Sequence, residues 1–369
     1  MPEQVGPELA ALADKARAFA TDVLLPLRGG PPEEAWQAAV AASRAAGFHQ
    51  MTQPRAFGGS EAGTLALTVV RDELAAANPP CVDAVFGPGP GVLADVGEPL
   101  KSSHLLPLLS GARRAGFAFT EPDDAPHPTR ATRDGDALVI TGAKSYVTGG
   151  AHADFLNTLV QVEDAGPALV VIDTHLPGVT LTRRFTSLDG SEHAAFRFDA
   201  VRVPATHLIG QPGEGMPRAL RQIGDTRLAI AAHCVGLMRW TIGFLESHLA
   251  RPGRGGVPRG APEGVRLRYA DLRIRAFAAR SMLYRAARLA DAGENVVNEG
   301  IACKVFATET VGDVVDTAIQ LVGGNALVDD HPLAELYRRV RSLRLAEGGS
   351  DVLRLNLARG KLDLDKGRL

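Results

Sequence analysis

Cysteine is scarce in this chain, which has only Cys81, Cys234 and Cys303 among 369 residues. Their odd number and scattered positions match neither a disulfide framework nor a metal-binding spacing, and they favour a reducing cytoplasm. An excess of charge of one sign is also missing, because the formal net charge is −2. A nearly neutral chain argues against nucleic acid or an anionic membrane as the main partner, since both attract a strong basic excess.

Long apolar runs are absent as well. No uninterrupted apolar segment approaches the roughly 20 residues that cross a bilayer. The first residues, MPEQVGPELAALADKARAF, lack the basic region and apolar core of a signal peptide. The ten histidines are dispersed, and HExxH, G-x-S-x-G and P-loop patterns are missing, so we expect no metal site and neither acyl nor nucleotide hydrolysis.

The residues that are present predict three regions, because 369 residues exceed one ordinary core. Residues 1–113 show apolar side chains at spacings of three and four, which is typical of helices. Residues 114–212 contain short apolar runs separated by turn dipeptides, which predicts a β-domain. Residues 213–369 return to long helical patterns over 218–249, 264–292 and 295–322. We therefore expect an N-terminal helical domain, a middle β-domain and a C-terminal helical domain.

Two glycine turns near the C-terminus are the most informative feature. One follows a helical pattern that contains Gln320 and ends at Gly323-Gly324, and the other holds Glu347 ahead of Gly348-Gly349. Glycine permits a positive φ and lets the backbone approach a bulky ligand closely. A carboxylate displayed on such a turn is poised to act on a ligand beside it.

With Tyr337–Arg341 between them, these turns resemble the Q-x-x-G-G…R-D-x-R…E-G-T/S pattern of the acyl-CoA dehydrogenase family. The order of helices, β-domain and helices resembles the layout of that family over essentially the whole chain. Arg339 stands where the pattern has Asp. The resemblance implies an α+β fold with an N-terminal helical domain (1–113), a middle small β-barrel or sheet domain (114–212) and a C-terminal four-helix bundle (213–369).

The same resemblance implies an oxidoreductase that acts on CH–CH groups. Glu347 would abstract the α proton of an acyl thioester, and N5 of FAD would accept the β hydride. Such a base needs reach to the α proton and a pKa raised by burial, and the thioester oxygen needs hydrogen-bond donors. By resemblance, Arg227 lines the same active site and can orient the carboxylate or stabilise the enolate.

Two segments of the β-domain resemble the family's flavin-contacting strands. Gly116-Phe117-Ala118-Phe119-Thr120-Glu121-Pro122 matches aromatic-x-x-T-E-P, and Lys144-Ser145-Tyr146-Val147-Thr148 matches K-x-W-I-T. The aromatic residue of the second segment packs on the flavin in the family, and its threonine hydroxyl approaches the redox nitrogen. The resemblance therefore implies flavin contacts by Phe117, Phe119, Thr120, Tyr146, Val147 and Thr148.

The phosphate-binding motifs depart from the family. Gln320, Gly323 and Gly324 keep the turn that a neighbouring subunit contributes, and Gly349 and Asp351 occupy further cofactor-contacting positions. Pro252 stands where the family has an arginine for the pyrophosphate, so Arg254 or Arg251 is the expected substitute. The usual loop serine is replaced by Pro126, which has no donor, and Asp123 and Asp124 would repel a phosphate that they face.

The resemblance also implies partners. We expect an acyl thioester of CoA or of a carrier protein, an electron-transfer flavoprotein or oxygen as acceptor, and a homo- or hetero-oligomer, either dimer or tetramer. Two alternatives stay open, namely an FAD-deficient partner subunit of a heteromeric enzyme and a flavin monooxygenase on the same fold. Acyl chain length, carrier and electron acceptor are not encoded in a recognisable motif.

Overall fold

The computed structural model describes residues 5–368, and its internal contacts separate two compact units. The helical unit contains the chain up to Met51, Ala62–Phe86 and the chain from Gly224 onward. The strand unit contains Thr52–Glu61 and Gly87–Ile223. The N-terminal helical region is thus shared between the units, and the domain boundaries at residues 113 and 212 stay a prediction.

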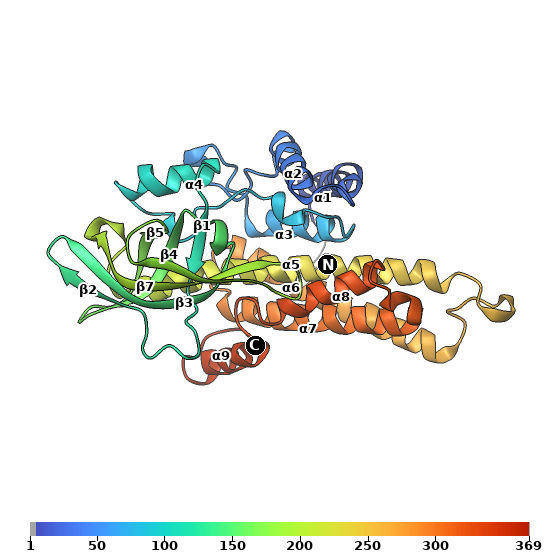
Figure 1. The fold of residues 1–369 in the computed structure, drawn as a ribbon. Coiled ribbons are helices and arrows are strands. Elements are labelled where there is room, and N and C mark those ends of the chain that lie inside the picture. The colour runs from blue at the N-terminus through green and yellow to red at the C-terminus, as the bar shows by residue number, and fades with distance from the viewer. Residues whose placement is uncertain (1–4, 369) are drawn as a thin grey trace. The chain divides into compact units, whose positions relative to one another are not determined.

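The strand unit is built on one sheet of eight strands, ordered β6-β7-β3-β2-β4-β5-β8 with β1 paired to β4 (Figure 1). Because successive side chains of a strand point to opposite faces, Phe155 and Leu156 of β4 belong to different cores. The face with Phe155 also packs against Leu108 and Leu109 of the short helix α4. The elements are β1 (Ala115–Ala118), β2 (Arg130–Asp134), β3 (Ala137–Thr148), β4 (Phe155–Val162), β5 (Gly166–Asp173), β6 (Val179–Thr186), β7 (Glu192–Pro204), β8 (Leu208–Ile209) and α4 (Leu106–Ser110).

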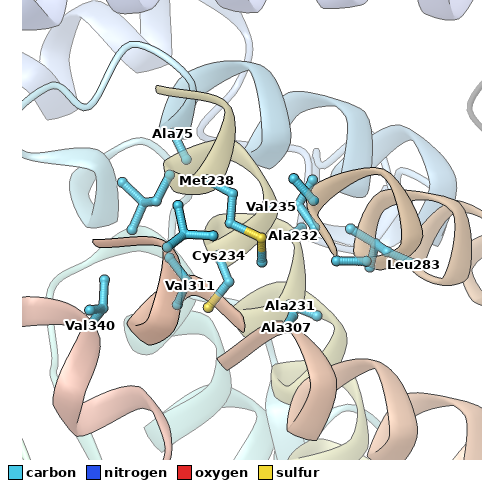
Figure 2. Packing of buried hydrophobic residues seen from close by; sticks show 14 of the residues in the cluster. Ala75, Ala231, Ala232, Cys234, Val235, Met238, Leu283, Ala307, Val311 and Val340 are labelled. Carbon is cyan, nitrogen blue, oxygen red and sulfur yellow. The ribbon is translucent and has the colours of Figure 1, made fainter. Parts of the chain in front are cut away.

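The helical unit surrounds a core of small and branched side chains, several of which appear in Figure 2. Ala231 and Ala232 of α5 and Ala307 of α7 are buried in this core. At Gly236 a Cβ atom would lie 2.4 Å from the backbone oxygen of Asp72, so α3 crosses α5 at a glycine. The helices are α1 (Pro7–Phe19), α2 (Pro32–Ala46), α3 (Thr64–Ala75), α5 (Gly215–Leu249, in this unit from Gly224 onward), α6 (Glu263–Asp291), α7 (Val297–Val322), α8 (Pro332–Leu343) and α9 (Ser350–Leu362).

A buried ionic network joins three of these helices. Asp72 of α3 is fully buried and accepts hydrogen bonds from Arg239 of α5 (2.7 Å), Arg280 of α6 (2.9 Å) and the Tyr284 hydroxyl (2.8 Å). Glu73 accepts a further bond from Arg239 at 3.0 Å. A buried carboxylate with this many charged donors is satisfied, and the network fixes how α3 meets α5 and α6.

The α+β fold expected from the sequence is confirmed, with helical N- and C-terminal parts and a central sheet. The expected helices at 218–249, 264–292 and 295–322 match α5, α6 and α7 to within a few residues. Helix α5 is long and apolar enough to meet a length and composition test for crossing a membrane, but more than half of its apolar window is buried inside the protein. A buried core helix passes the same test.

Candidate active site

Glu347 lies in a strained loop between α8 and α9. Its φ is +53°, and that of Gly348 is +106°. The left-handed region costs a residue with a Cβ roughly 1 kcal/mol, so the loop holds Glu347 in a conformation that it would not adopt alone. Strained non-glycine residues of this kind are found at many functional sites.

Arg227 of α5 is 7% exposed and holds this loop through the backbone, because its Nε donates to the carbonyl oxygen of Glu347 at 3.1 Å. Burial raises the pKa of the half-buried Glu347 carboxyl, while the positive charges of Arg227 and Lys304 oppose the rise. Burial likewise lowers the pKa of Arg227, and Glu347 opposes that change. The structure therefore brings the two expected catalytic residues together.

Lys304 of α7 was not predicted as a site residue from the sequence. Its side chain is fully buried, and its Nζ donates to the carbonyl oxygens of Arg344 (3.1 Å) and Gly348 (2.8 Å), on either side of Glu347. A signal was available: Lys304 interrupts the apolar helical run Ile301-Ala302-Cys303-Lys304-Val305-Phe306-Ala307. A lysine on the buried face of a helix needs partners.

We expect Glu347 to lower stability at neutral pH. Because its folded pKa is raised, the folded state binds more protons between the unfolded and folded pKa values, and stability falls as pH rises through that window. Glu347→Gln should therefore be more stable than the native protein above the folded pKa and equal to it below the unfolded one. Glu347→Gly should gain about 1 kcal/mol more at every pH by relieving the strain. Chemical denaturation from pH 4 to 8 measures both, and a native protein more stable than Glu347→Gln at pH 7 would contradict the expectation.

In the strand unit, the two segments expected to contact a flavin are neighbours. The Ser145 amide donates to the Thr120 carbonyl at 2.8 Å, and the buried Lys144 bonds the Phe119 carbonyl at 3.1 Å and pairs with Glu121 at 3.0 Å. Thr120 is exposed. Phe117 and Phe119 stack on each other at 5.9 Å and are partly buried against the core near α4.

The second segment contains a bulge that exposes an aromatic ring. Tyr146 has a φ of +53° and is 64% exposed, and the β3–β7 register shifts between Lys144 and Val147. Val147 is fully buried in the sheet core, so only its backbone is available to a ligand. An exposed ring two residues from the exposed Thr148 suits a flat aromatic ligand with polar edges.

The Thr148 hydroxyl is oriented by a residue that sequence reasoning missed. Thr148 Oγ1 lies 3.2 Å from Nδ1 of His193, whose Nε2 lies 3.0 Å from Ser191 Oγ. Ser191 gives its one hydroxyl proton to the Asp189 carboxylate at 2.6 Å, so it accepts from Nε2–H of His193. With a neutral imidazole, Nδ1 then accepts the Thr148 proton, and the lone pairs of the Thr148 oxygen are left for a ligand.

The residues expected to bind the phosphates of FAD form a less complete site than those expected to contact its ring. Asp123, Asp124 and Pro126 lie in an exposed turn, and Pro252 forms a β-bridge with Pro258. The side chain of Arg254 lies outside the described part of the structure. In the helical unit, Gln320 is exposed at the end of α7, and Gly323 follows it with a φ of +87°. The residues therefore fit the ring of a flavin better than its pyrophosphate.

The remaining expected positions are also located. Gly324 begins a short 3-10 turn, Gly349 precedes the first residue of α9 with a φ of −62°, and Asp351 pairs with Arg354 at 3.4 Å. The described residues contain no group of three His, Cys, Asp or Glu side chains that could hold a metal ion. The cofactor roles assigned from the resemblance stay predictions.

Comparison with known proteins places these features in a family. The model of the acyl-CoA dehydrogenase N-terminal domain matches residues 6–111, and that of the acyl-CoA dehydrogenase C-terminal domain matches residues 213–362. The chain is 28% identical over 375 residues to the probable acyl-CoA dehydrogenase FadE25 of Mycobacterium tuberculosis (strain ATCC 25618 / H37Rv), covering 98% of this chain and 92% of that protein.

Two further similarities point the same way. The acryloyl-CoA reductase (NADH) of Anaerotignum propionicum is 28% identical over 324 residues, covering 83% of this chain and 82% of the reductase. The crystal structure of a probable acyl-CoA dehydrogenase from Mycobacterium abscessus ATCC 19977 / DSM 44196 superposes with a TM-score of 0.84 at 27% identity, covering 96% of this chain and 99% of that one.

Proposed function

The chain belongs to the acyl-CoA dehydrogenase family of flavin-dependent CH–CH oxidoreductases, and from this premise we propose that it α,β-dehydrogenates an acyl thioester with Glu347 as the base. The observation that carries the proposal is the Glu347 loop. A carboxyl group with a raised pKa sits on a strained turn, and a buried arginine holds its backbone. A carboxylate base with a raised pKa suits proton abstraction beside a carbonyl.

Each residue has a defined part in this chemistry. The Glu347 carboxylate takes the α proton, and the raised pKa makes it a stronger base than an exposed glutamate. Arg227 fixes the Glu347 peptide and places a positive charge near the developing enolate. The thioester oxygen would be stabilised by backbone N–H donors of the same loop. The bound flavin supplies the hydride acceptor.

FAD is the proposed flavin, and the strand unit would hold its ring. The exposed Tyr146 ring can stack on the isoalloxazine, and the oriented Thr148 oxygen offers it a hydrogen-bond acceptor. Gln320, Gly323 and Gly324 would serve the cofactor of a second copy. The carrier is CoA or a carrier protein, and the electron acceptor is an electron-transfer flavoprotein or oxygen. The three free cysteines support a cytoplasmic location.

An oligomer is part of the proposal. Leu267, Ile274 and Phe277 lie on α6 at intervals of seven and three residues and are 62%, 64% and 58% exposed. This spacing places them on one face of the helix, and an exposed apolar face supports association with another subunit.

The test begins with the visible absorption spectrum of the purified protein titrated with FAD. We expect flavin bands that remain after gel filtration, and an enoyl thioester two hydrogens lighter when the complex is incubated with acyl-CoAs of different chain lengths. A protein that never retains FAD would contradict the proposal. That outcome would favour the FAD-deficient partner subunit, which the Pro126 turn already favours.

The acidic turn gives a separate prediction. Asp123→Asn/Asp124→Asn should bind FAD about fivefold more tightly, because each exposed charge contributes up to about 0.5 kcal/mol of repulsion to a nearby phosphate. Glu163→Gln, which removes another exposed carboxylate of the strand unit, should leave affinity unchanged. Fluorescence titration with FAD at low salt measures both, and equal affinities in all three proteins would show that the turn does not face the cofactor.

A further inference from the structure

Lys304 is a buried cation whose two hydrogen-bond partners neutralise no charge. Its Nζ donates to the backbone carbonyls of Arg344 and Gly348, and its side chain is fully buried. Burying an ammonium group without an ion-paired carboxylate is costly, and burial lowers its pKa to about 8. The interactions that Lys304 makes must therefore offset the cost of burying its ammonium group.

The two carbonyls that Lys304 binds enclose the strained residue. Arg344 is three residues before Glu347, and Gly348 directly follows it. The carbonyl of Glu347 itself is bonded by Arg227 from α5, so cations from two helices hold the consecutive carbonyls 347 and 348. Fixing both carbonyls fixes the peptide planes on the C-terminal side of Glu347 and the conformation of Gly348, where a Cβ would lie 3.0 Å from Leu353.

The Lys304 charge also acts on the Glu347 carboxylate, opposing the effect of burial together with Arg227. Other titratable groups around Lys304 are the buried Cys234 thiol of α5 and Glu309 of α7. Glu309 is itself paired with Arg354 at 2.5 Å. Burial raises the pKa of Glu347, and the charges of Arg227 and Lys304 both oppose that rise.

We propose that Lys304 is the positioning residue of the base-bearing loop: its ammonium group holds Glu347 in the left-handed conformation and supplies a positive charge that acts on its carboxylate. This inference rests on the proposed role of Glu347. Lys304 touches neither substrate nor cofactor in this assignment and acts through the loop.

Two substitutions separate the hydrogen bonds of Lys304 from its charge. Lys304→Gln keeps two N–H donors for the carbonyls but removes the charge, whereas Lys304→Met removes both the donors and the charge. Cys303→Ala is the matched control, because Cys303 is a buried neighbour on the same helix and its truncation removes packing without removing a charge.

The experiment is a pH titration by NMR of the flavin-free protein with 13C-labelled glutamate carboxyls, the Glu347 signal being assigned by its loss in Glu347→Gln. We expect the pKa of Glu347 to move upward in Lys304→Gln and Lys304→Met and to stay unchanged in Cys303→Ala. An unchanged pKa in Lys304→Gln, or the same shift in Cys303→Ala, would overturn the proposal. If Lys304→Met does not fold, Lys304→Gln decides alone.

A second readout uses the FAD-loaded protein and the washout of deuterium from the α carbon of an acyl-CoA. Lys304→Met should lose about tenfold in rate, the equivalent of one hydrogen bond to a charged group, with KM nearly unchanged, and Lys304→Gln should lose less. No washout by the native protein would refute the proposed function while leaving the NMR result on Lys304 to stand or fall by itself.

Discussion

Glu347→Gln is expected to lower the rate of α-proton removal from an acyl thioester by about 10³-fold, within the range that a general base contributes. Glutamine keeps the size of the side chain and the strained loop but cannot accept the proton. FAD affinity should not change, because the substitution removes no donor to the cofactor. The rate is measured as deuterium washout from the α carbon of a labelled acyl-CoA.

The control for this substitution is Glu263→Gln, which neutralises an exposed carboxylate in the first turn of α6. It should retain the native washout rate. A Glu347→Gln protein that washes out deuterium within a factor of three of the native rate would show that another group removes the proton.

Asp72→Asn is expected to destabilise the protein by about 4 kcal/mol, since removing one partner of a buried ionic network leaves the others unpaired. Asp72 is fully buried, and three donors from α5 and α6 converge on it. The substitution is isosteric, but its NH₂ group would face guanidinium donors. The free energy of unfolding from urea denaturation at pH 7 measures the loss.

Asp313→Asn is the matched comparison for Asp72→Asn. Asp313 also pairs with two arginines, Arg275 at 3.1 Å and Arg344 at 3.4 Å, but its side chain is 53% exposed. Solvent screens such pairs, so we expect a loss below about 1 kcal/mol. Equal losses at the two positions would mean that burial does not decide the strength of the network.

The sequence predicted the elements better than the contacts between them. Helical periodicity located α5, α6 and α7, because each of these long helices buries apolar side chains that recur at helical spacing. The Asp72 network was not foreseen, because Asp72 and Arg280 are more than 200 residues apart and no local pattern links them.

In the candidate active site, too, the sequence predicted local features better than the contacts between distant residues. The glycines around Glu347 indicated a turn, and the structure brings Arg227 to that turn across 120 residues of sequence. The partners of Lys304 are backbone carbonyls, which leave no trace in side-chain identity. His193 was dismissed among the dispersed histidines, although strand pairing places it opposite Thr148. Val147 matched the family motif, yet its side chain belongs to the core.

The measurement that tests the proposed function most directly is the anaerobic reaction of the FAD-loaded protein with an acyl-CoA, followed at the flavin absorption band in a stopped-flow instrument. We predict that the native protein bleaches in a single turnover and releases an enoyl thioester, whereas Glu347→Gln with the same bound FAD stays coloured on that timescale. Equal bleaching by both proteins, or none by the native protein with any chain length, would contradict the assignment of Glu347 as the base of an acyl thioester dehydrogenase.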